Sequence, residues 1–115
     1  MKIERHSFGS LTIDGRTYHS DLIIYPNGKI QDTWWRKRSH ILSKDDIELL
    51  IDKDPEVIVV GAGTNGLMKP EKGLADYLIS KGIEFICAPN EEAIKIFNRM
   101  YKFKKKVGAC FHLTC

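Results

Sequence analysis

The chain has 115 residues, of which 43% are hydrophobic and 29% are charged, and its formal net charge is +3. This length suits one domain, residues 1–115, and the composition excludes a disordered chain. The mild charge lacks the strongly basic character of nucleic-acid-binding domains, so nucleic acid is not an expected partner.

The first forty residues are predicted to be antiparallel β structure. Residues 7–19 form a hairpin around Asp14-Gly15, a pair that accepts the positive φ of a two-residue turn. Residues 22–35 form a second hairpin that turns at Pro26-Asn27-Gly28. Two successive hairpins predict an N-terminal antiparallel meander.

From residue 43 onward, helices and strands are expected to alternate. Ser43, followed by two acids, is typical of a helix start. The run 57–60 is apolar on both faces, as buried parallel strands are. A second helix is expected to begin at Pro70 and to end at Gly82.

A third helix is expected to begin at Asn90 and to bury Ile94, Phe97 and Tyr101. Four lysines follow near its C-terminal end, where the helix dipole favours cations: Lys102, Lys104, Lys105 and Lys106. Strands at 83–87 and 107–113 complete two strand–helix–strand steps, which predict parallel pairing with right-handed crossovers.

The segment Gly61-Ala62-Gly63-Thr64-Asn65-Gly66 matches the GxGxxG pattern of dinucleotide sites. Such a site also needs a helix that begins within the pattern and an acid at the end of the next strand. Pro70 puts the expected helix start too late, and Cys87-Ala88-Pro89 supplies no carboxylate. We therefore expect no dinucleotide site and no cofactor.

Two interpretations of this loop stay open. Its amides and Lys69 could hold an anion at the end of a parallel strand, with His112 as an acid or base. Alternatively, the glycines only permit a tight turn, and His112 is a hydrogen-bonded structural residue. The candidate ligand-binding residues are Gly61, Gly63, Thr64, Asn65, Gly66, Lys69 and His112.

No catalytic set or metal site is predicted. No nucleophile or carboxylate is placed near His112 by local spacing, and the segment 112–115 holds too few ligands for zinc. His6, His19 and His40 are isolated in the sequence.

The segment Trp34-Trp35-Arg36 precedes two further cations and is the most unusual part of the chain. Neighbouring side chains on a strand point to opposite faces, so one tryptophan can enter the core while the other covers the surface. Because exposed Trp and Arg dominate binding hot spots, Trp34, Trp35 and Arg36 are candidate partner-binding residues. The preferred interpretation, however, places both rings in the core and the cations in solvent.

Cysteine usage favours a reducing compartment. The three cysteines are an odd number without a CxxC pair. Cys87 and Cys110 are expected to pack as small apolar side chains. No apolar run is of membrane-spanning length and the N-terminus does not read as a signal peptide, so we expect a cytoplasmic protein without membrane contact.

Four segments, in this order and spacing, resemble the Mth-nine-three-eight-like domain family: residues 22–28, Trp34-Trp35-Arg36, the loop 61–66 and His112-Leu113-Thr114-Cys115. The family includes archaeal and bacterial hypothetical proteins, an adipogenesis-associated protein and a mitochondrial complex I assembly factor. The resemblance implies a three-layer α/β fold whose central, mixed, mostly parallel sheet of about five strands is flanked by helices, with β structure packed on it.

The resemblance implies no established catalytic activity, and the best-described role in the family is assisting the assembly of a protein complex. We therefore expect a non-enzymatic protein-binding or complex-assembly module, acting through a protein partner or self-association. The alternative is a small anionic-ligand-binding protein or enzyme with its site at the Gly61–Gly66 loop near His112.

Overall fold

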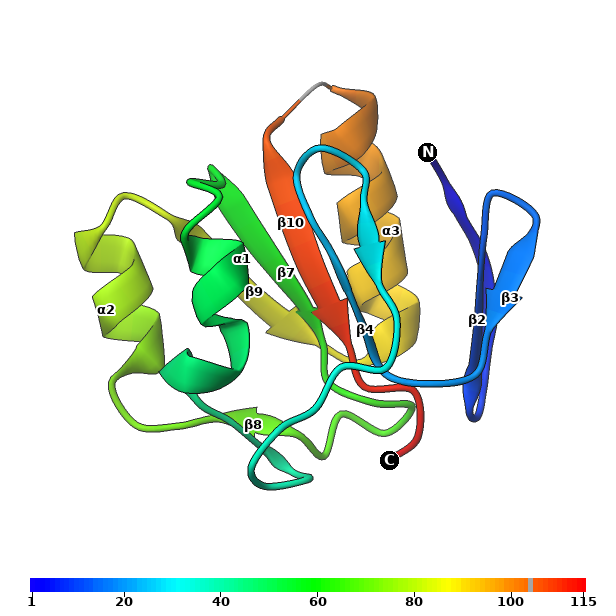
Figure 1. The fold of residues 1–115 in the computed structure, drawn as a ribbon, viewed down its shortest axis with the longest axis horizontal. Helices are drawn as coiled ribbons and strands as arrows, with labels where there is room; N and C mark the ends of the chain where they lie inside the picture. The colour runs from blue at the N-terminus through cyan, green and yellow to red at the C-terminus, as the bar shows by residue number, and fades with distance from the viewer. Residues whose placement is uncertain (104) are drawn as a thin grey trace.

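A five-stranded mixed sheet forms the centre of the computed structural model, which describes residues 1–103 and 105–115 (Figure 1). Its order is β5 (Ile30–Gln31), β4 (Leu22–Ile24), β10 (Val107–Phe111), β7 (Val57–Gly61) and β9 (Glu84–Ala88). β10, β7 and β9 are mutually parallel, whereas β4 runs antiparallel to both of its neighbours. The predicted α/β fold with a mixed, mostly parallel sheet is therefore confirmed.

A separate antiparallel sheet is formed by β1 (Ile3–Ser7), β2 (Ser10–Ile13) and β3 (Arg16–Tyr18). The turn at Asp14-Gly15 is confirmed, with φ angles of 49° and 82°. A further turn at Gly9, with φ 84°, divides the expected strand 7–13 and creates β1. The predicted N-terminal antiparallel meander is therefore confirmed as β1–β3. The second expected hairpin also forms, but β4 and β5 belong to the main sheet and do not pair with β3.

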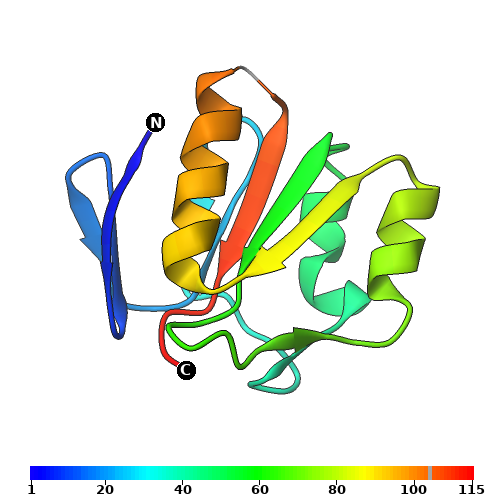
Figure 2. The same cartoon turned by 180° about the vertical axis from the view of Figure 1, so that it is seen from behind.

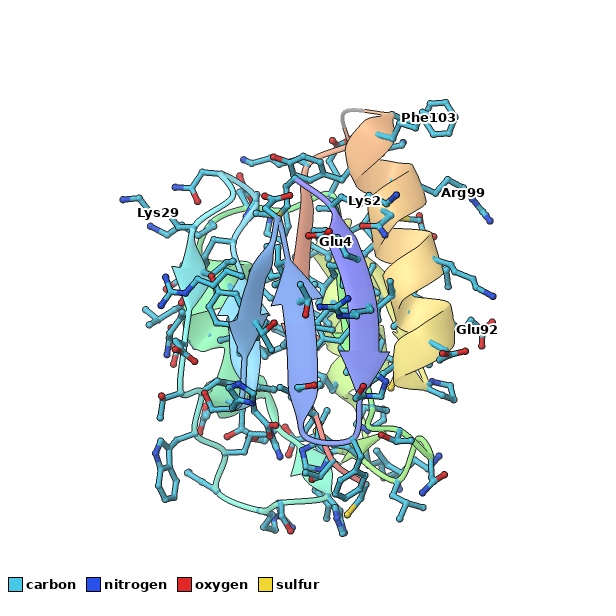
Figure 3. All side chains as sticks on the ribbon, turned by 90° about the vertical axis from the view of Figure 1, so that its right-hand side faces the viewer. Lys2, Glu4, Lys29, Glu92, Arg99 and Phe103 are labelled. Carbon is cyan, nitrogen blue, oxygen red and sulfur yellow. The ribbon has the colours of Figure 1, made fainter. Side chains whose placement is uncertain are left out.

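The two faces of the main sheet carry different layers (Figures 1 and 2). α3 (Asn90–Lys102) and the β1–β3 sheet cover one face, where Val57 and Val59 of β7 are buried. Figure 3 shows that small sheet lying beside α3. α1 (Glu48–Ile51) and α2 (Leu74–Ser80) cover the other face, where Ile58 and Val60 are buried. Burial on both faces explains the uninterrupted apolar run of β7.

The expected start of the second helix at Pro70 is wrong. Lys69–Pro70 form the short strand β8, which pairs in parallel with β6 (Ile41–Leu42). α2 begins only at Leu74, after Gly73 with φ 88°. Pairing with a segment distant in sequence outweighed the local preference of proline for a first helical turn.

The first and third helices begin close to their expected positions. Ser43 precedes a 3₁₀ turn, η1 (Lys44–Ile47), that leads into α1, and the Ser43 amide donates to Asp46 Oδ2 at 2.8 Å. α3 begins at Asn90 and buries Phe97 fully, while Ile94 and Tyr101 are half-buried. Of the predicted lysine cluster, Lys104 lies outside the described residues. Within the described residues, no helix has the length and apolar character needed to cross a bilayer.

Candidate functional site

The glycine loop closes on the chain segment that follows β10. The Thr64 amide donates to Thr114 O at 2.6 Å, and the Asn65 amide donates to Cys115 O at 3.0 Å. Gly63 has φ +102°, and a Cβ at this position would overlap the main chain of Cys115. The close approach of two main-chain segments is therefore what requires glycine here.

The amides of this loop are occupied within the chain. Every residue from 62 to 69 donates its N–H to an acceptor of the protein: Ala88 O, Asn90 Oδ1, Thr114 O, Cys115 O (from both Asn65 and Leu67), Gly63 O, Ala62 O and His40 O. The described residues 62–69 thus offer no unused amide to an anion. The late start of α2 also removes the helix N-terminus from the site.

The hollow beside Lys69 does not extend to His112. Lys69 and Cys87 border a small hollow of about 140 Å³, which is also lined by loop residues Asn65 and Gly66 but not by His112. Of the predicted ligand-binding residues, only Asn65, Gly66 and Lys69 line this hollow. Gly61, Gly63 and Thr64 do not line it, and His112 lies in a different group of side chains.

Asn90, expected only as a helix start, holds the loop and the C-terminal segment together. It is fully buried, its Nδ2 donates to His112 O at 2.7 Å, and its Oδ1 accepts the Gly63 amide at 3.1 Å. At Gly61 a Cβ would collide with Asn90 Oδ1 and the Phe111 ring. Gly61 therefore makes room for this amide side chain.

His112 directly follows β10 and is joined to Asp21 and Arg36. Its Nδ1 lies 2.8 Å from Asp21 Oδ2, and the same carboxylate oxygen lies 2.7 Å from Arg36 Nη1. Burial of the Asp21 carboxyl opposes its charge, but hydrogen bonds from His112, the Leu113 amide and Arg36 outweigh this and lower its pKa. Asp21 is therefore held as a carboxylate.

The charge on Asp21 determines the tautomer of His112. A carboxylate can only accept, so His112 Nδ1 carries the proton that it donates to Asp21. Arg36 Nη2 lies 3.0 Å from the same Nδ1, but it is also a donor and has Ser39 O as its acceptor at 2.9 Å. In the neutral form of the ring, the lone pair is therefore on Nε2.

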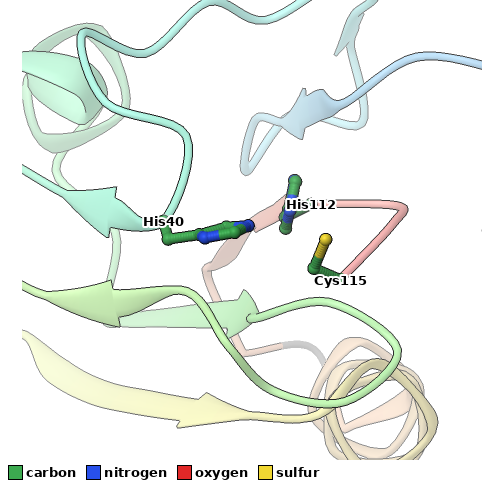
Figure 4. A group of neighbouring side chains, drawn as sticks. All are labelled: His40, His112 and Cys115. Carbon is green, nitrogen blue, oxygen red and sulfur yellow. The ribbon is translucent and has the colours of Figure 1, made fainter.

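The side chains of His40 and Cys115 lie next to His112 (Figure 4). The rings of His40 and His112 meet edge to face with their centroids 5.9 Å apart. One ligand atom from each of His40, His112 and Cys115 lies within 4.8 Å of the other two. His40 is isolated in the sequence but not in the folded structure, because the pairing of β6 with β8 places it near the end of β10.

The two tryptophans have opposite environments. Trp34 is 6% exposed and its Nε1 donates to Asp46 O at 2.8 Å, whereas Trp35 is 83% exposed. The preferred interpretation, with both rings in the core, is therefore wrong. The expected solvation of Arg36 is wrong too, since its side chain is 5% exposed and its guanidinium lies over the Trp34 ring at 4.7 Å. Asp21 and Ser39 O draw this cation inward.

Trp35 borders a surface hollow of about 800 Å³ between β5 and the η1–α1 segment. Leu49, which is 61% exposed, lies on the α1 side of this hollow. Its charged lining residues are Arg36, Lys37, Asp45, Asp46, Glu48 and Asp52. Four acids against two cations make this part of the surface acidic although the whole chain carries +3.

The comparisons with known proteins agree with this architecture. A model of a family described as "Protein of unknown function (DUF498/DUF598)" matches residues 3–112. The conserved hypothetical protein PH1505 from Pyrococcus horikoshii OT3 is 28% identical, with a TM-score of 0.77 and 100% of both chains covered. The protein MT938 is 25% identical, with a TM-score of 0.80 over 99% of this chain and 98% of its own.

A more distant structure shares the fold alone. A Bordetella pertussis protein described as a Mth938-like domain is 12% identical, with a TM-score of 0.66 over 97% of this chain and 85% of its own. Together with the family match over residues 3–112, these likenesses identify the chain: it belongs to the DUF498/DUF598 family of Mth938-like domains.

Proposed function

We propose that this domain is a non-enzymatic protein-binding or complex-assembly module that contacts its partner through the Trp35 surface, defined as Trp35, Leu49 and the hollow between them. The observation that carries the proposal is the 83% exposure of Trp35 at the rim of a hollow of about 800 Å³. A large aromatic ring held in solvent next to a concave surface is the usual arrangement of a binding hot spot.

The charges around the Trp35 surface favour a partner with basic side chains. Asp45 is paired with Lys37 at 3.5 Å, but no ion pair among the described residues involves Glu48 or Asp52, and both are exposed. Acids that are not neutralised by neighbours attract Lys and Arg of a partner and increase the rate of encounter. A segment that combines basic residues with an apolar anchor would fit this surface.

Self-association is a second form of the same proposal. β5 is an edge strand of the main sheet and contains only Ile30–Gln31, so its outer side is available for contact with another chain beside the hollow. We place the module in the cytoplasm because all three cysteines are free thiols, as in reducing compartments.

The test compares three forms of the protein as affinity baits: the unchanged chain, Trp35→Ala and the control Phe103→Ala. Phe103 is 72% exposed at the end of α3, so it matches Trp35 in exposure but lies on another part of the surface (Figure 3). A stoichiometric partner that is kept by Phe103→Ala and lost from Trp35→Ala supports the proposal. Sedimentation of the same three proteins tests self-association.

Charge is tested by the double variant Glu48→Gln/Asp52→Asn. We expect it to bind the same partner more slowly and with less dependence on salt. Partner sets that do not differ among the unchanged chain, Trp35→Ala and Phe103→Ala would contradict the proposal.

The anionic-ligand alternative has less support. It depends on free amides in the loop and on a cleft that joins the loop to His112, but the described amides of residues 62–69 are all used and the hollow beside Lys69 does not include His112.

A further inference from the structure

We propose that His40, His112 and Cys115 form a binding site for one divalent zinc-type cation. Their ligand atoms lie within 4.8 Å of one another. His112 and Cys115 both belong to the segment after β10, whereas His40 precedes β6 and is distant from them in the sequence. None of the three ligands lines the hollow of the Trp35 surface, although Arg36 both lines that hollow and contacts His112, and the inference does not depend on the function proposed for that surface.

The donor set is the first argument for zinc. Two imidazole nitrogens and one cysteine sulfur are the ligands that Zn²⁺ prefers, and they are poor ligands for Mg²⁺ or Ca²⁺. Zn–N bonds of about 2.0 Å and Zn–S bonds of about 2.3 Å place tetrahedral ligand atoms roughly 3.3–3.8 Å apart. The three ligand atoms lie within 4.8 Å of one another, so binding requires them to approach further, and His40, which is exposed, is the ligand least held by packing.

The second argument is the state of His112. Asp21 accepts the Nδ1 proton at 2.8 Å, which leaves the Nε2 lone pair directed away from the carboxylate. A carboxylate that orients a histidine in this way is the usual outer partner of a zinc-bound imidazole. The Thr114 hydroxyl lies 3.4 Å from Nε2, a distance too long for a strong competing hydrogen bond.

The third argument is that the main chain of each ligand is fixed. His40 O accepts the Lys69 amide at 2.9 Å, and Cys115 O accepts the amides of Asn65 and Leu67. His112 O accepts Nδ2 of the buried Asn90 at 2.7 Å. Residues 65–69 and Asn90 thus hold the main chains of the three ligands in place, which reduces the ordering cost of binding a cation.

The local charges also permit a cation. Arg36 is the nearest buried positive group, but it lies on the Nδ1 side of His112 and is neutralised by Asp21 at 2.7 Å. On binding, the Cys115 thiol releases its proton to solvent and the thiolate supplies a negative charge to the metal. Three protein ligands leave a fourth position for water or another small ligand.

The test is titration of the reduced 115-residue chain with Zn²⁺ in competition with a chromophoric chelator, and separately with Co²⁺. We expect one Zn²⁺ per chain, and a Co²⁺ complex whose absorption includes a thiolate-to-metal charge-transfer band. Loss of an outer-shell partner weakens metal binding by roughly 10- to 100-fold, so loss of a direct ligand in His40→Ala or Cys115→Ser should weaken Zn²⁺ binding at least as much. Cys115→Ser should also remove the charge-transfer band.

Two matched controls separate this site from general thiol or imidazole binding. His19 and Cys87 are exposed and belong to no such cluster among the described residues, so His19→Ala and Cys87→Ser should bind Zn²⁺ like the unchanged chain. Circular dichroism of each variant checks that the fold is kept. If Cys115→Ser does not fold, the proposal is tested by the Zn²⁺ affinity of His40→Ala and by the charge-transfer band of the unchanged chain. The proposal is overturned by the absence of stoichiometric binding, by a Co²⁺ complex without the band, or by equal loss in a control.

Discussion

Asp21 and Arg36 form a largely buried ion pair, with Asp21 Oδ2 2.7 Å from Arg36 Nη1 and side-chain exposures of 20% and 5%. The pair joins the start of β4 to the segment after β5, and through His112 it reaches the end of β10. Three separate parts of the chain therefore depend on one carboxylate.

Replacement of Asp21 by Asn should destabilise the protein strongly. The change leaves the buried Arg36 guanidinium without its counter-ion, which costs about 3 kcal/mol in the free energy of unfolding. Urea denaturation measures this, and Asp45→Asn is the matched control, because the Lys37–Asp45 pair is 75% and 65% exposed. The free energy of unfolding of Asp45→Asn should fall by less than about 1 kcal/mol. A similar fall in both variants would show that the buried pair stabilises the protein no more than the exposed pair.

The neighbouring tryptophans should respond differently to the same substitution. Trp34→Ala removes a ring that is 6% exposed together with its hydrogen bond to Asp46 O, and should cost about 3–5 kcal/mol. Trp35→Ala should change stability by no more than about 0.5 kcal/mol, because the ring is 83% exposed. Thermal and urea unfolding of the two variants provide the comparison, and a large loss in Trp35→Ala would mean that this ring packs on the domain.

Gly63→Ala tests the closure of the loop on the C-terminal segment. The new Cβ would meet the Cys115 main chain at a positive φ, so we expect a loss of about 3 kcal/mol or more. Gly73→Ala is the control: it has a similar positive φ but open space around the Cβ, and should lose only about 1–2 kcal/mol. Equal losses would indicate that the loop moves away from Cys115 without cost.

Cys110 should make stability fall at high pH. Burial raises the pKa of this thiol well above its ordinary value of 9.0. Below pH 9.0 the thiol is neutral in both the folded and the unfolded protein, so its ionisation does not reduce the free energy of unfolding. Above this pH the unfolded thiol ionises while the folded one does not, so the free energy of unfolding falls by about 1.4 kcal/mol per pH unit.

Urea denaturation between pH 8 and about pH 10.5 measures this slope. Cys110→Ala should have a shallower slope than the unchanged chain, whatever its stability at pH 8. Alkylation gives an independent check: Cys110 should stay unmodified in the folded protein, while the exposed Cys87 reacts. Identical slopes in the two proteins would contradict the assignment.

Local sequence patterns are sufficient to predict features that depend on the residue itself or on its neighbours in the sequence. The positive φ angles of Asp14 and Gly15 follow from the preferences of those residues for turns. The positive φ of Gly82, just after α2 ends at Ser80, follows from the same preference of glycine. The apolar run of β7 predicts burial on both faces because alternate side chains point to opposite sides of the sheet.

Long-range contacts were not predictable in the same way. Asp21 and His112 are 91 residues apart in sequence, and no local feature of Asp21 distinguishes it from a solvated acid at the start of a strand. The expected helix start at Pro70 is wrong for the same reason, since the strand that contains Pro70 exists only through pairing with β6. The cluster of His40, His112 and Cys115 depends on that pairing and on the closed loop, neither of which leaves a periodic signal.

The place of β10 has a consequence for the order in which the domain folds during synthesis. β10 lies between β4 and β7 in the sheet, but it follows both of them in the sequence. On the ribosome, the β4–β5 hairpin and the β7–β9 pair are made early, and they cannot join until β10 emerges and fills the gap between them. Both inner edges stay unpaired during this interval, when they are open to a chaperone or to pairing with other nascent chains.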